Sequence, residues 1–264
     1  KIDTKIILRI SGFPKLNFIR KFLWKILVPR VYCITCPTEA TKNYIISLKV
    51  IEKEKIFYLA DPIVELDNLK KKDLKNEINY KKKYNNYIFS AGRLTKQKNY
   101  KFLIDCFSEI EKKYPDLNLV IAGDGEQKNI LINLIKKFKM EKKIFLIGYT
   151  EDVFNLMKNS ICYVSVSLWE DPGFTLVEAI SKKAPVISSD CNNGPKEILS
   201  LGNGGYLYKT NDKKDFLNTF YKFYDDHDKN SLDLNIKKIN ALKNIKLFTK
   251  FHHYKNFLKI ITKS

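Results

Sequence analysis

Apolar and polar positions alternate regularly along most of this chain, and their spacing predicts where strands and helices lie. Short apolar runs rich in β-branched residues predict buried strands. These runs occupy residues 5–10, 31–36, 56–59, 87–91, 117–122, 143–147, 161–168, 185–188 and 205–208. Between the later runs, apolar residues recur at helical spacing, as Phe102, Leu103, Cys106 and Phe107 do. From residue 87 onward the alternation of strands and helices predicts a parallel sheet with helices on both sides.

One stretch, residues 161–181, carries most of the candidate chemistry. Its apolar run ends at a turn that contains Pro172 and Gly173, and a helix is expected to start near Thr175. Thr175 and Glu178 have the spacing of a capping box, in which Glu178 would bond the start of its own helix. The free amides of a helix start also attract anions, so the turn is a candidate anion site with Glu170 and Glu178 beside it.

The residues that follow successive predicted strands form a second pattern. They are Gly92-Arg93, Gly123-Asp124-Gly125, Gly148-Tyr149, the turn from Glu170 to Phe174, and the segment from Asp190 to Gly194. Ligands of parallel sheets bind outside the carboxyl ends of the strands, where these residues would gather. Tight turns alone would explain the glycines, but they would not explain Arg93 with Lys98 five positions later. The distribution predicts a ligand that carries phosphate.

The overall charge is strongly positive. The 264 residues include 48 Lys and Arg against 29 Asp and Glu, for a net charge of +19. A surplus of this size favours an anionic partner such as nucleic acid, acidic lipid or a phosphorylated substrate. A general bias toward Lys, Asn and Ile explains it equally well, because the lysines are scattered. A nucleic-acid-binding protein remains a remote alternative, since the lysine run near residues 68–84 has no stacking aromatics arranged for single strands.

The five cysteines form no disulfide framework and indicate a reducing compartment. Cys33-x-x-Cys36 could be a redox or metal site, but its apolar neighbours favour the end of a strand. No stretch is long and apolar enough for a membrane span. Residues 16–28 have apolar residues on one helical face and Lys or Arg around them. This pattern fits a helix on an anionic membrane surface, and it also fits an ordinary helix that faces a core.

Taken together, four motifs resemble the C-terminal half of a family 4 retaining glycosyltransferase. In chain order they are Ala91-Gly92-Arg93-Leu94 with Lys98, Ala122-Gly123-Asp124-Gly125-Glu126, Glu170-Asp-Pro-Gly-Phe-Thr-Leu-Val-Glu178-Ala, and Ala184-Pro-Val-Ile-Ser-Ser-Asp190. They cover about half of the chain. The resemblance implies a GT-B fold, which has two Rossmann-like domains with doubly wound parallel sheets, the second of which binds the nucleotide sugar. Subfamily features resemble bacterial enzymes that build lipopolysaccharide, capsule or lipid-linked oligosaccharides.

The resemblance also implies roles for individual residues. Arg93 and Lys98 would hold the diphosphate beside Gly92, and Glu170 would lie near the hydroxyls of the donor sugar, so these three side chains are the expected catalytic ones. Glu178 would bond the ribose, which competes with its capping-box interpretation. The nucleotide sugar would also contact Gly173, Phe174 and Thr175 near the phosphates, and Gly148 and Tyr149 near the base. The alternatives are a surface ion pair for Arg93 and simple solvation of the turn for Glu170.

No cofactor or metal is expected, because cationic side chains and helix amides would take the role of a metal. The expected activity is transfer of a hexose or N-acetylhexosamine from a UDP-sugar to a glycan or lipid-linked acceptor with retention. A module that binds the nucleotide sugar without turning it over is the alternative. The enzyme is expected in the cytoplasm, or at the inner face of the membrane through residues 16–28.

The expected domains follow from the same resemblance. Residues 1–63 would be the end of an incomplete N-terminal acceptor domain, 64–86 a linker and 87–230 the nucleotide-sugar domain. Residues 231–264 would be C-terminal helices, the last crossing back to the first domain. The chain begins at Lys1 without the family's glycine-rich acceptor loop, so upstream residues are expected to be missing. The family's histidine after the first strand is also absent, and Arg9 or Ser11 is expected to replace it.

Overall fold

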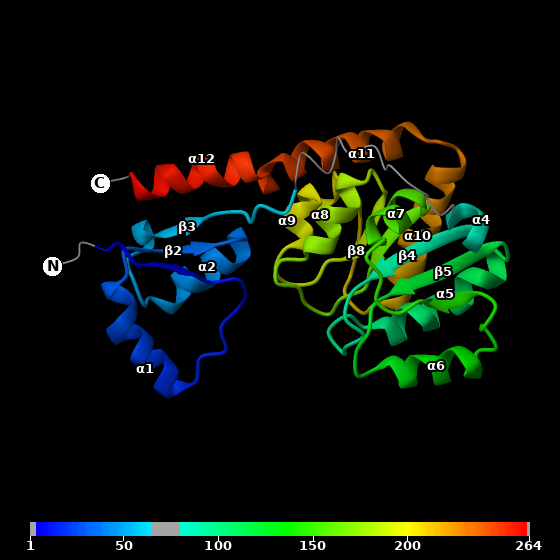
Figure 1. Ribbon diagram of the computed structural model, residues 1–264, viewed down its shortest axis with the longest axis horizontal. Helices are drawn as coiled ribbons and strands as arrows, with labels where there is room; N and C mark the ends of the chain where they lie inside the picture. The colour runs from blue at the N-terminus through cyan, green and yellow to red at the C-terminus, as the bar shows by residue number, and fades with distance from the viewer. Residues whose placement is uncertain (1–3, 65–79, 263–264) are drawn as a thin grey trace. The chain divides into compact units, whose positions relative to one another are not determined.

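The computed structural model describes residues 4–64 and 80–262 of the chain. The chain packs as two compact units, one formed by Lys1–Ile63 with Leu247–Ser264 and the other by Val64–Lys246 (Figure 1). Most of the expected linker, residues 65–79, lies outside the described residues. Its end is helix α4 (Tyr80–Tyr84), which packs on α7 in the second unit. The C-terminal helices divide between the units, with α11 (Leu232–Asn244) in the second and α12 (Lys250–Ile261) in the first.

The first unit is built on a small parallel sheet. Its strands β1 (Ile7–Arg9), β2 (Cys33–Cys36) and β3 (Ile56–Tyr58) pair in that order, with Ile7 opposite Cys33 and Ile34 opposite Ile56. The helices of this unit are α1 (Phe18–Leu27), η1 (Val28–Arg30), α2 (Glu39–Leu48), η2 (Lys53–Lys55) and α12. Ile260 of α12 is buried with Cys33 and Leu59, so the last helix belongs to the core of the first strands.

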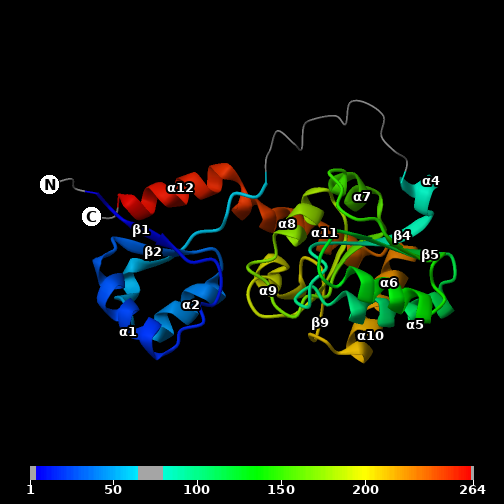
Figure 2. The same cartoon turned by 60° about the horizontal axis from the view of Figure 1, so that its bottom comes forward.

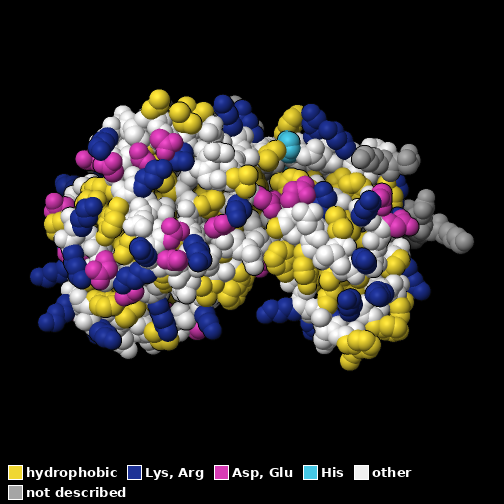
Figure 3. Space-filling view, turned by 180° about the vertical axis from the view of Figure 1, so that it is seen from behind, with side chains coloured by type: hydrophobic (Ala, Val, Ile, Leu, Met, Phe, Trp, Pro, Cys, Tyr) yellow, Lys and Arg dark blue, Asp and Glu magenta, His cyan; other side chains and the backbone are white. Residues whose placement is uncertain are grey.

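Helix α1 exposes its apolar face. None of its residues is buried, and its large apolar side chains are exposed, namely Phe18, Ile19, Phe22, Leu23, Ile26 and Leu27. Trp24 is half-buried and packs against the unit's core. Figure 3 shows hydrophobic side chains gathered over this helix, with Lys and Arg side chains around them. Within the described part of the chain, the apolar face of this helix therefore stays exposed.

The second unit contains a six-stranded parallel sheet in the order β6-β5-β4-β7-β8-β9. The strands are β4 (Asn86–Ala91), β5 (Leu117–Ala122), β6 (Ile144–Leu146), β7 (Cys162–Ser165), β8 (Val186–Ser189) and β9 (Tyr206–Tyr208). All nine predicted strands therefore occur, although the run at residues 161–168 leaves the sheet after Ser165. The chain moves outward from β4 through β5 and β6, and then outward on the other side through β7, β8 and β9. This order is that of a doubly wound Rossmann-like sheet.

Helices cover both faces of this sheet, as Figures 1 and 2 show. α5 (Tyr100–Lys113) packs between α6 (Lys128–Lys137) and α10 (Lys213–Asp228) on one face. α8 (Phe174–Ser181) packs against α7 (Val153–Asn159), α9 (Pro195–Ile198) and α11 on the other, and the 3-10 turns η3 (Ser200–Gly202) and η4 (Ile245–Phe248) follow α9 and α11. Phe216, Phe220 and Phe223 of α10 are fully buried, which fixes this helix on the apolar core.

The five cysteines are all free and buried. Cys33 and Cys36 are the two ends of β2 rather than a turn between ligands. Burial raises the pKa of the Cys36 thiol to about 12, so the thiol stays protonated at neutral pH. Their position agrees with the interpretation of this pair as part of a strand.

The loops that follow β7 and β8 touch through a glycine. Gly194 has φ +124°, and a Cβ built on it would lie 1.7 Å from the carbonyl oxygen of Pro172. Only a residue without a side chain fits this close approach of two backbones. Gly194 thus fixes the turn that carries Glu170 against the loop after β8.

Replacing Gly194 with Ala should destabilise the protein by at least about 2 kcal/mol, because the methyl group meets a backbone oxygen in a strained conformation. Thermal and urea unfolding of the two proteins measure the loss. Gly202→Ala is the matched control, since Gly202 also has positive φ, +91°, but a Cβ there would lie 3.9 Å from its nearest neighbour, Leu207 Cδ1. Equal losses of unfolding free energy in the two variants would show that the contact with Pro172 contributes nothing to stability.

Candidate active site

The order of the sheet places the candidate site. β4 pairs with β5 on one side and with β7 on the other. The sheet therefore extends in one direction through β5 and β6, and in the opposite direction from β7 onward. Ligands of such sheets bind in the crevice outside the carboxyl ends of the strands at this reversal. Gly92 and Arg93 follow β4 directly, and Glu170 lies five residues after the end of β7. The Tyr163 hydroxyl of β7 donates a hydrogen bond of 3.0 Å to the carbonyl of Ala91 and joins the two strand ends.

A cavity of about 670 Å³ lies at this edge of the second unit. Five of the predicted ligand residues line it, and they come from three segments far apart in the sequence: Gly92, Arg93, Tyr149, Thr175 and Glu178. The rest of the lining is Ala91, Ala122, Gly123, Asp124, Thr150, Glu151 and Val153. A cavity of this size is in the range of sites for small organic ligands. The residues that sequence motifs grouped together therefore meet in space.

Glycines bring the lining loops together. A Cβ on Gly123 would lie 1.9 Å from the carbonyl oxygen of Gly92, and Gly123 donates its backbone N–H to Gly148 at 2.7 Å. The loops after β4, β5 and β6 thus touch through their backbones at one corner of the cavity. Gly92 and Gly148 are held by their backbone contacts with Gly123. Tyr149, which follows Gly148 directly, is positioned by the same contacts.

Four lining residues of the cavity are exposed, namely Arg93, Asp124, Tyr149 and Glu151. Arg93 forms no ion pair with any residue in the described part of the chain, which argues against the alternative of a surface ion pair. The Tyr149 ring is 79% exposed. Arg93 and Tyr149 therefore offer a cation and an aromatic face, a combination that suits a phosphate and a planar base, beside the carboxylates of Asp124 and Glu151.

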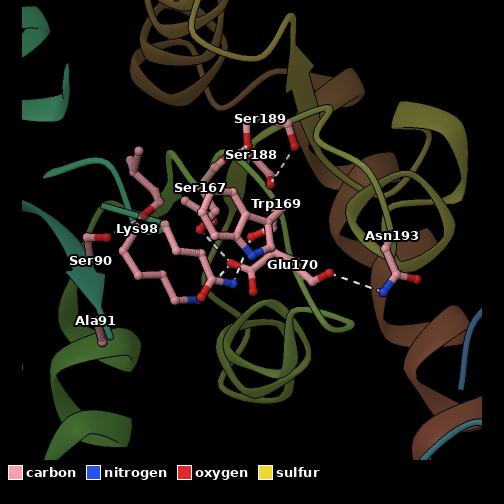
Figure 4. Close-up of polar contacts among 12 residues, drawn as sticks. Ser90, Ala91, Lys98, Ser167, Trp169, Glu170, Ser188, Ser189 and Asn193 are labelled. Carbon is pink, nitrogen blue, oxygen red and sulfur yellow. Dashed lines mark hydrogen bonds and ion pairs between the residues drawn. The ribbon is translucent and has the colours of Figure 1, made fainter. Parts of the chain in front are cut away.

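Lys98 and Glu170 lie beside the cavity and bind each other. Lys98 Nζ is 2.7 Å from Glu170 Oε1, and the two side chains are only 16% and 5% exposed. The hydroxyl of Ser167 donates a second hydrogen bond, of 2.5 Å, to the same carboxylate oxygen (Figure 4). Glu170 is therefore a buried, paired carboxylate, and its interpretation as a solvated turn residue is wrong. The Lys98 side chain also passes close to Gly92, since a Cβ there would lie 3.2 Å from Lys98 Cε.

The loop after β8 holds the Glu170 turn from behind. The Asn193 amide donates to the carbonyl oxygen of Glu170 at 3.1 Å and to the Asp171 carboxylate at 3.2 Å. The Ser189 hydroxyl donates to the carbonyl of Ser167 at 2.6 Å. Ser167 and Asn193 were not among the predicted site residues, because the polar partners that give them a role lie in other segments of the sequence.

The helix after the turn starts one residue earlier than the pattern suggested. α8 begins at Phe174 with Gly173 as its N-cap, and no side chain caps it. The capping-box interpretation of Thr175 and Glu178 is therefore wrong, because Thr175 already lies inside the helix, where its hydroxyl interacts with Tyr163. Glu178 is left to face the cavity. Burial raises the pKa of its carboxyl group above the usual range, and the positive charge of Lys98 opposes that shift.

Arg9 of the first unit has a partner of its own. Its guanidinium forms two hydrogen bonds with the carboxylate of Asp61, which is buried after β3. This ion pair joins the carboxyl ends of β1 and β3. Replacement of the family's histidine contact by Arg9 or by the exposed Ser11 stays a prediction. Among residues 4–64 and 80–262, no three His, Cys, Asp or Glu side chains are arranged to hold a metal ion.

Comparison with known proteins adds a family to this geometry. The family model described as "Glycosyl transferases group 1" matches residues 71–240. An uncharacterized glycosyltransferase of Methanocaldococcus jannaschii is 43% identical over 143 residues, which are 52% of this chain and 34% of that protein. The UDP-Gal:alpha-D-GlcNAc-diphosphoundecaprenol alpha-1,3-galactosyltransferase of Escherichia coli is 32% identical over 173 residues, 64% of this chain and 44% of that protein. The chain spans about a third to a half of the length of these curated relatives.

Solved structures show the same fold over nearly the whole chain. A glycosyltransferase from Rickettsia africae matches with a TM-score of 0.83 at 18% identity, over 98% of this chain and 71% of that one. The Anabaena protein HepE, solved in complex with UDP and glucose, matches with a TM-score of 0.80 at 16% identity, over 98% and 72%. These neighbours are GT-B glycosyltransferases, so the predicted α/β fold of GT-B type is confirmed. Because the family model covers well over half of its residues, the chain belongs to the glycosyl transferases group 1 family.

Proposed function

We propose that this chain carries the nucleotide-sugar site of a retaining glycosyltransferase. The donor would be a UDP-sugar, the transferred group a hexose or N-acetylhexosamine, and the acceptor a glycan or lipid-linked sugar in the synthesis of bacterial polysaccharide, lipopolysaccharide or glycan. The observation that carries the proposal is the cavity beside the Lys98–Glu170 pair, where Arg93, Tyr149 and Glu178 meet. The names of relatives support the classes of donor and acceptor, since the E. coli protein is named for UDP-Gal and a diphosphoundecaprenol acceptor.

The charges of the site suit departure of a nucleoside diphosphate. Negative charge grows on the diphosphate as its bond to the sugar breaks, and cations held in place beforehand stabilise that charge. Arg93 lines the cavity and Lys98 lies behind Gly92, so both can act on one diphosphate. The amides of Gly173, Phe174 and Thr175 at the start of α8 would add donors to the same phosphates. With these groups in place, no metal ion is expected in the reaction.

Two carboxylates would position the rest of the donor. Glu178 is half-buried in the lining and would accept hydrogen bonds from the ribose hydroxyls, while Tyr149 would contact the base. Glu170 would bind hydroxyls of the donor sugar. The acceptor hydroxyl would attack from the face that the diphosphate leaves, and a phosphate oxygen would take its proton. This arrangement produces retention at the anomeric carbon.

A membrane surface is the proposed location of the acceptor. Helix α1 combines exposed apolar residues with Arg20, Lys21 and Lys25, which suits an anionic bilayer in which apolar side chains enter and basic ones bind headgroups. No helix of the described residues is long and apolar enough to cross a bilayer. We therefore propose peripheral attachment at the inner face of the membrane, where a lipid-linked acceptor would be presented.

Replacing Arg93 with Ala should weaken UDP binding at least about tenfold, because a charge-assisted hydrogen bond to phosphate contributes about 1.5–3 kcal/mol. Calorimetry with UDP measures the change, and transfer from UDP-sugars by the whole protein should slow as well. Lys96→Ala, an exposed cation on the same loop outside the cavity lining, is the matched control. Equal effects of both variants would refute the role of Arg93. UDP binding without any transfer would favour the binding-module alternative.

Replacing Glu178 with Gln should raise the melting temperature at neutral pH while it weakens UDP binding. The pKa of this half-buried carboxyl is raised, so its ionised form costs the folded state free energy above the ordinary pKa of glutamate, about 4.3. Below that pH both the folded and unfolded wild type are protonated, and the advantage of the variant should disappear. Melting curves between pH 3.5 and pH 8 follow the difference. A variant less stable than wild type at pH 7 would contradict this account.

Changing Phe18 and Phe22 together to Asp should lower binding to anionic liposomes at least about tenfold, since burying one such side chain contributes about 1.5–3 kcal/mol. Sedimentation with vesicles that contain acidic phospholipid measures the bound fraction. Leu232→Asp is the control, because Leu232 is a similarly exposed apolar residue of α11. Wild-type protein that stays in the supernatant, or an equal loss in the control, would exclude attachment through α1.

A further inference from the structure

Lys98 has two candidate anionic partners, and only one of them is part of the chain. Its ammonium lies 2.7 Å from the Glu170 carboxylate, and both side chains are largely shielded from water. Asp225 of α10 and Lys229, the residue after this helix, form a pair of similar length, 2.8 Å, but those side chains are 63% and 69% exposed. An exposed pair contributes little to stability, whereas shielded charges depend on each other strongly. The Lys98–Glu170 interaction is therefore a strong competitor for any other anion at Lys98.

The position of Lys98 puts this competition at the edge of the cavity. The Lys98 stem runs beside Gly92, which lines the cavity. Its positive charge also reaches Glu178 in the lining, because it lowers the pKa of that carboxyl against the effect of burial. Lys98 thus lies between the cavity and Glu170. The flexible Lys side chain can rotate about its terminal bonds, so its ammonium could face the cavity or Glu170.

Glu170 is held in place independently of Lys98. Its carboxylate accepts the Ser167 hydroxyl, and the Asn193 amide holds its carbonyl oxygen (Figure 4). A buried carboxylate that loses its only donor pays a large free-energy cost. The hydrogen bond from Ser167 reduces that cost when Lys98 turns away. The hydrogen bonds from Ser167 and Asn193 would therefore let Glu170 keep its position when Lys98 turns away.

We propose that Glu170 and the diphosphate of the nucleotide compete for Lys98. This inference rests on the proposed function. When the donor binds, the ammonium exchanges the carboxylate for the diphosphate, and no covalent bond forms or breaks in this step. After the sugar has been transferred, the return of Lys98 to Glu170 promotes release of the nucleoside diphosphate. Glu170 thus acts on the leaving nucleotide as well as on the donor sugar.

The two proposed roles of Glu170 predict opposite effects when its charge is removed: UDP binding should become tighter, and sugar transfer should become slower. Glu170→Gln keeps the shape of the side chain but removes the competing charge. UDP should bind about tenfold more tightly to this variant, equivalent to about 1.4 kcal/mol, and should dissociate more slowly. Sugar transfer should become slower at the same time. A residue that only touches the sugar would leave the affinity for UDP unchanged.

A double-mutant cycle tests the exchange directly. Calorimetry measures UDP binding to wild type, Glu170→Gln, Lys98→Met and the double variant, and Asp225→Asn controls for the loss of one negative charge elsewhere. The gain in UDP affinity that Glu170→Gln produces should vanish in the double variant, which also carries Lys98→Met. If the gain persists there, simple repulsion between Glu170 and phosphate explains it, and the exchange is refuted. A gain of the same size in Asp225→Asn refutes it as well.

A second variant of Glu170, which keeps its negative charge, separates the exchange from misfolding and from the simple loss of a charge. Glu170→Asp keeps the charge but shortens the side chain by one methylene, which lengthens its distance to Lys98. It should tighten UDP binding by a smaller factor, and an unchanged or weaker affinity refutes the exchange. Wild type that binds no UDP refutes the proposed function itself. Wild type that binds UDP while neither Glu170 variant binds it more tightly refutes only this inference.

Discussion

The position of β4 between β5 and β7 is the constraint on which the candidate site depends. Hydrogen bonds to both neighbours hold this strand at the centre of the six-stranded sheet. Because all strands are parallel, the segments that leave their carboxyl ends emerge at one edge. The chain can therefore bring Arg93, Tyr149 and Glu178 to one cavity although they are separated by long stretches of sequence. Loss of this pairing would scatter the site without changing any of its residues.

The loops at this edge are ordered by backbone contact more than by side chains. Gly123 lies against the carbonyl of Gly92, and Gly194 lies against the carbonyl of Pro172. Such close approaches leave no room for a Cβ, so the glycines set where the chemically active neighbours lie. A ligand site built in this way has rigid walls, and its adjustable parts are long side chains such as Lys98. Preorganised charge of this kind is what stabilises a transition state efficiently.

Electrostatics act at two scales in this protein. The net charge of +19 is spread over the surface and favours anionic partners in general. Close to the site the balance is local, because the buried carboxylate of Glu170 is matched by Lys98 and the half-buried Glu178 is left with a raised pKa. The charges beside the cavity are therefore balanced locally, independently of the net charge of the chain. Helix α1 adds a surface that is both basic and apolar, and this surface also favours anionic partners.

The sequence by itself determined the strands, most of the helices and the family, because these depend on local spacing and on motifs whose residues are close together. It also named five of the residues that line the cavity, since the residues that follow parallel strands gather at one edge of the sheet. It misplaced the start of α8, because Thr175 and Glu178 satisfy the local rule for a capping box while the loop through Gly173 starts the helix earlier.

Only the tertiary structure decided which side chains pair with one another. The pair of Lys98 with Glu170, and the support of Glu170 by Asn193, join segments whose separation in sequence carries no signal of contact. The exposure of α1 was equally undetermined, because an apolar stripe among basic residues fits a core and a membrane surface alike. Periodicity reports which residues share a face of an element. What that face meets depends on how the rest of the chain folds around it.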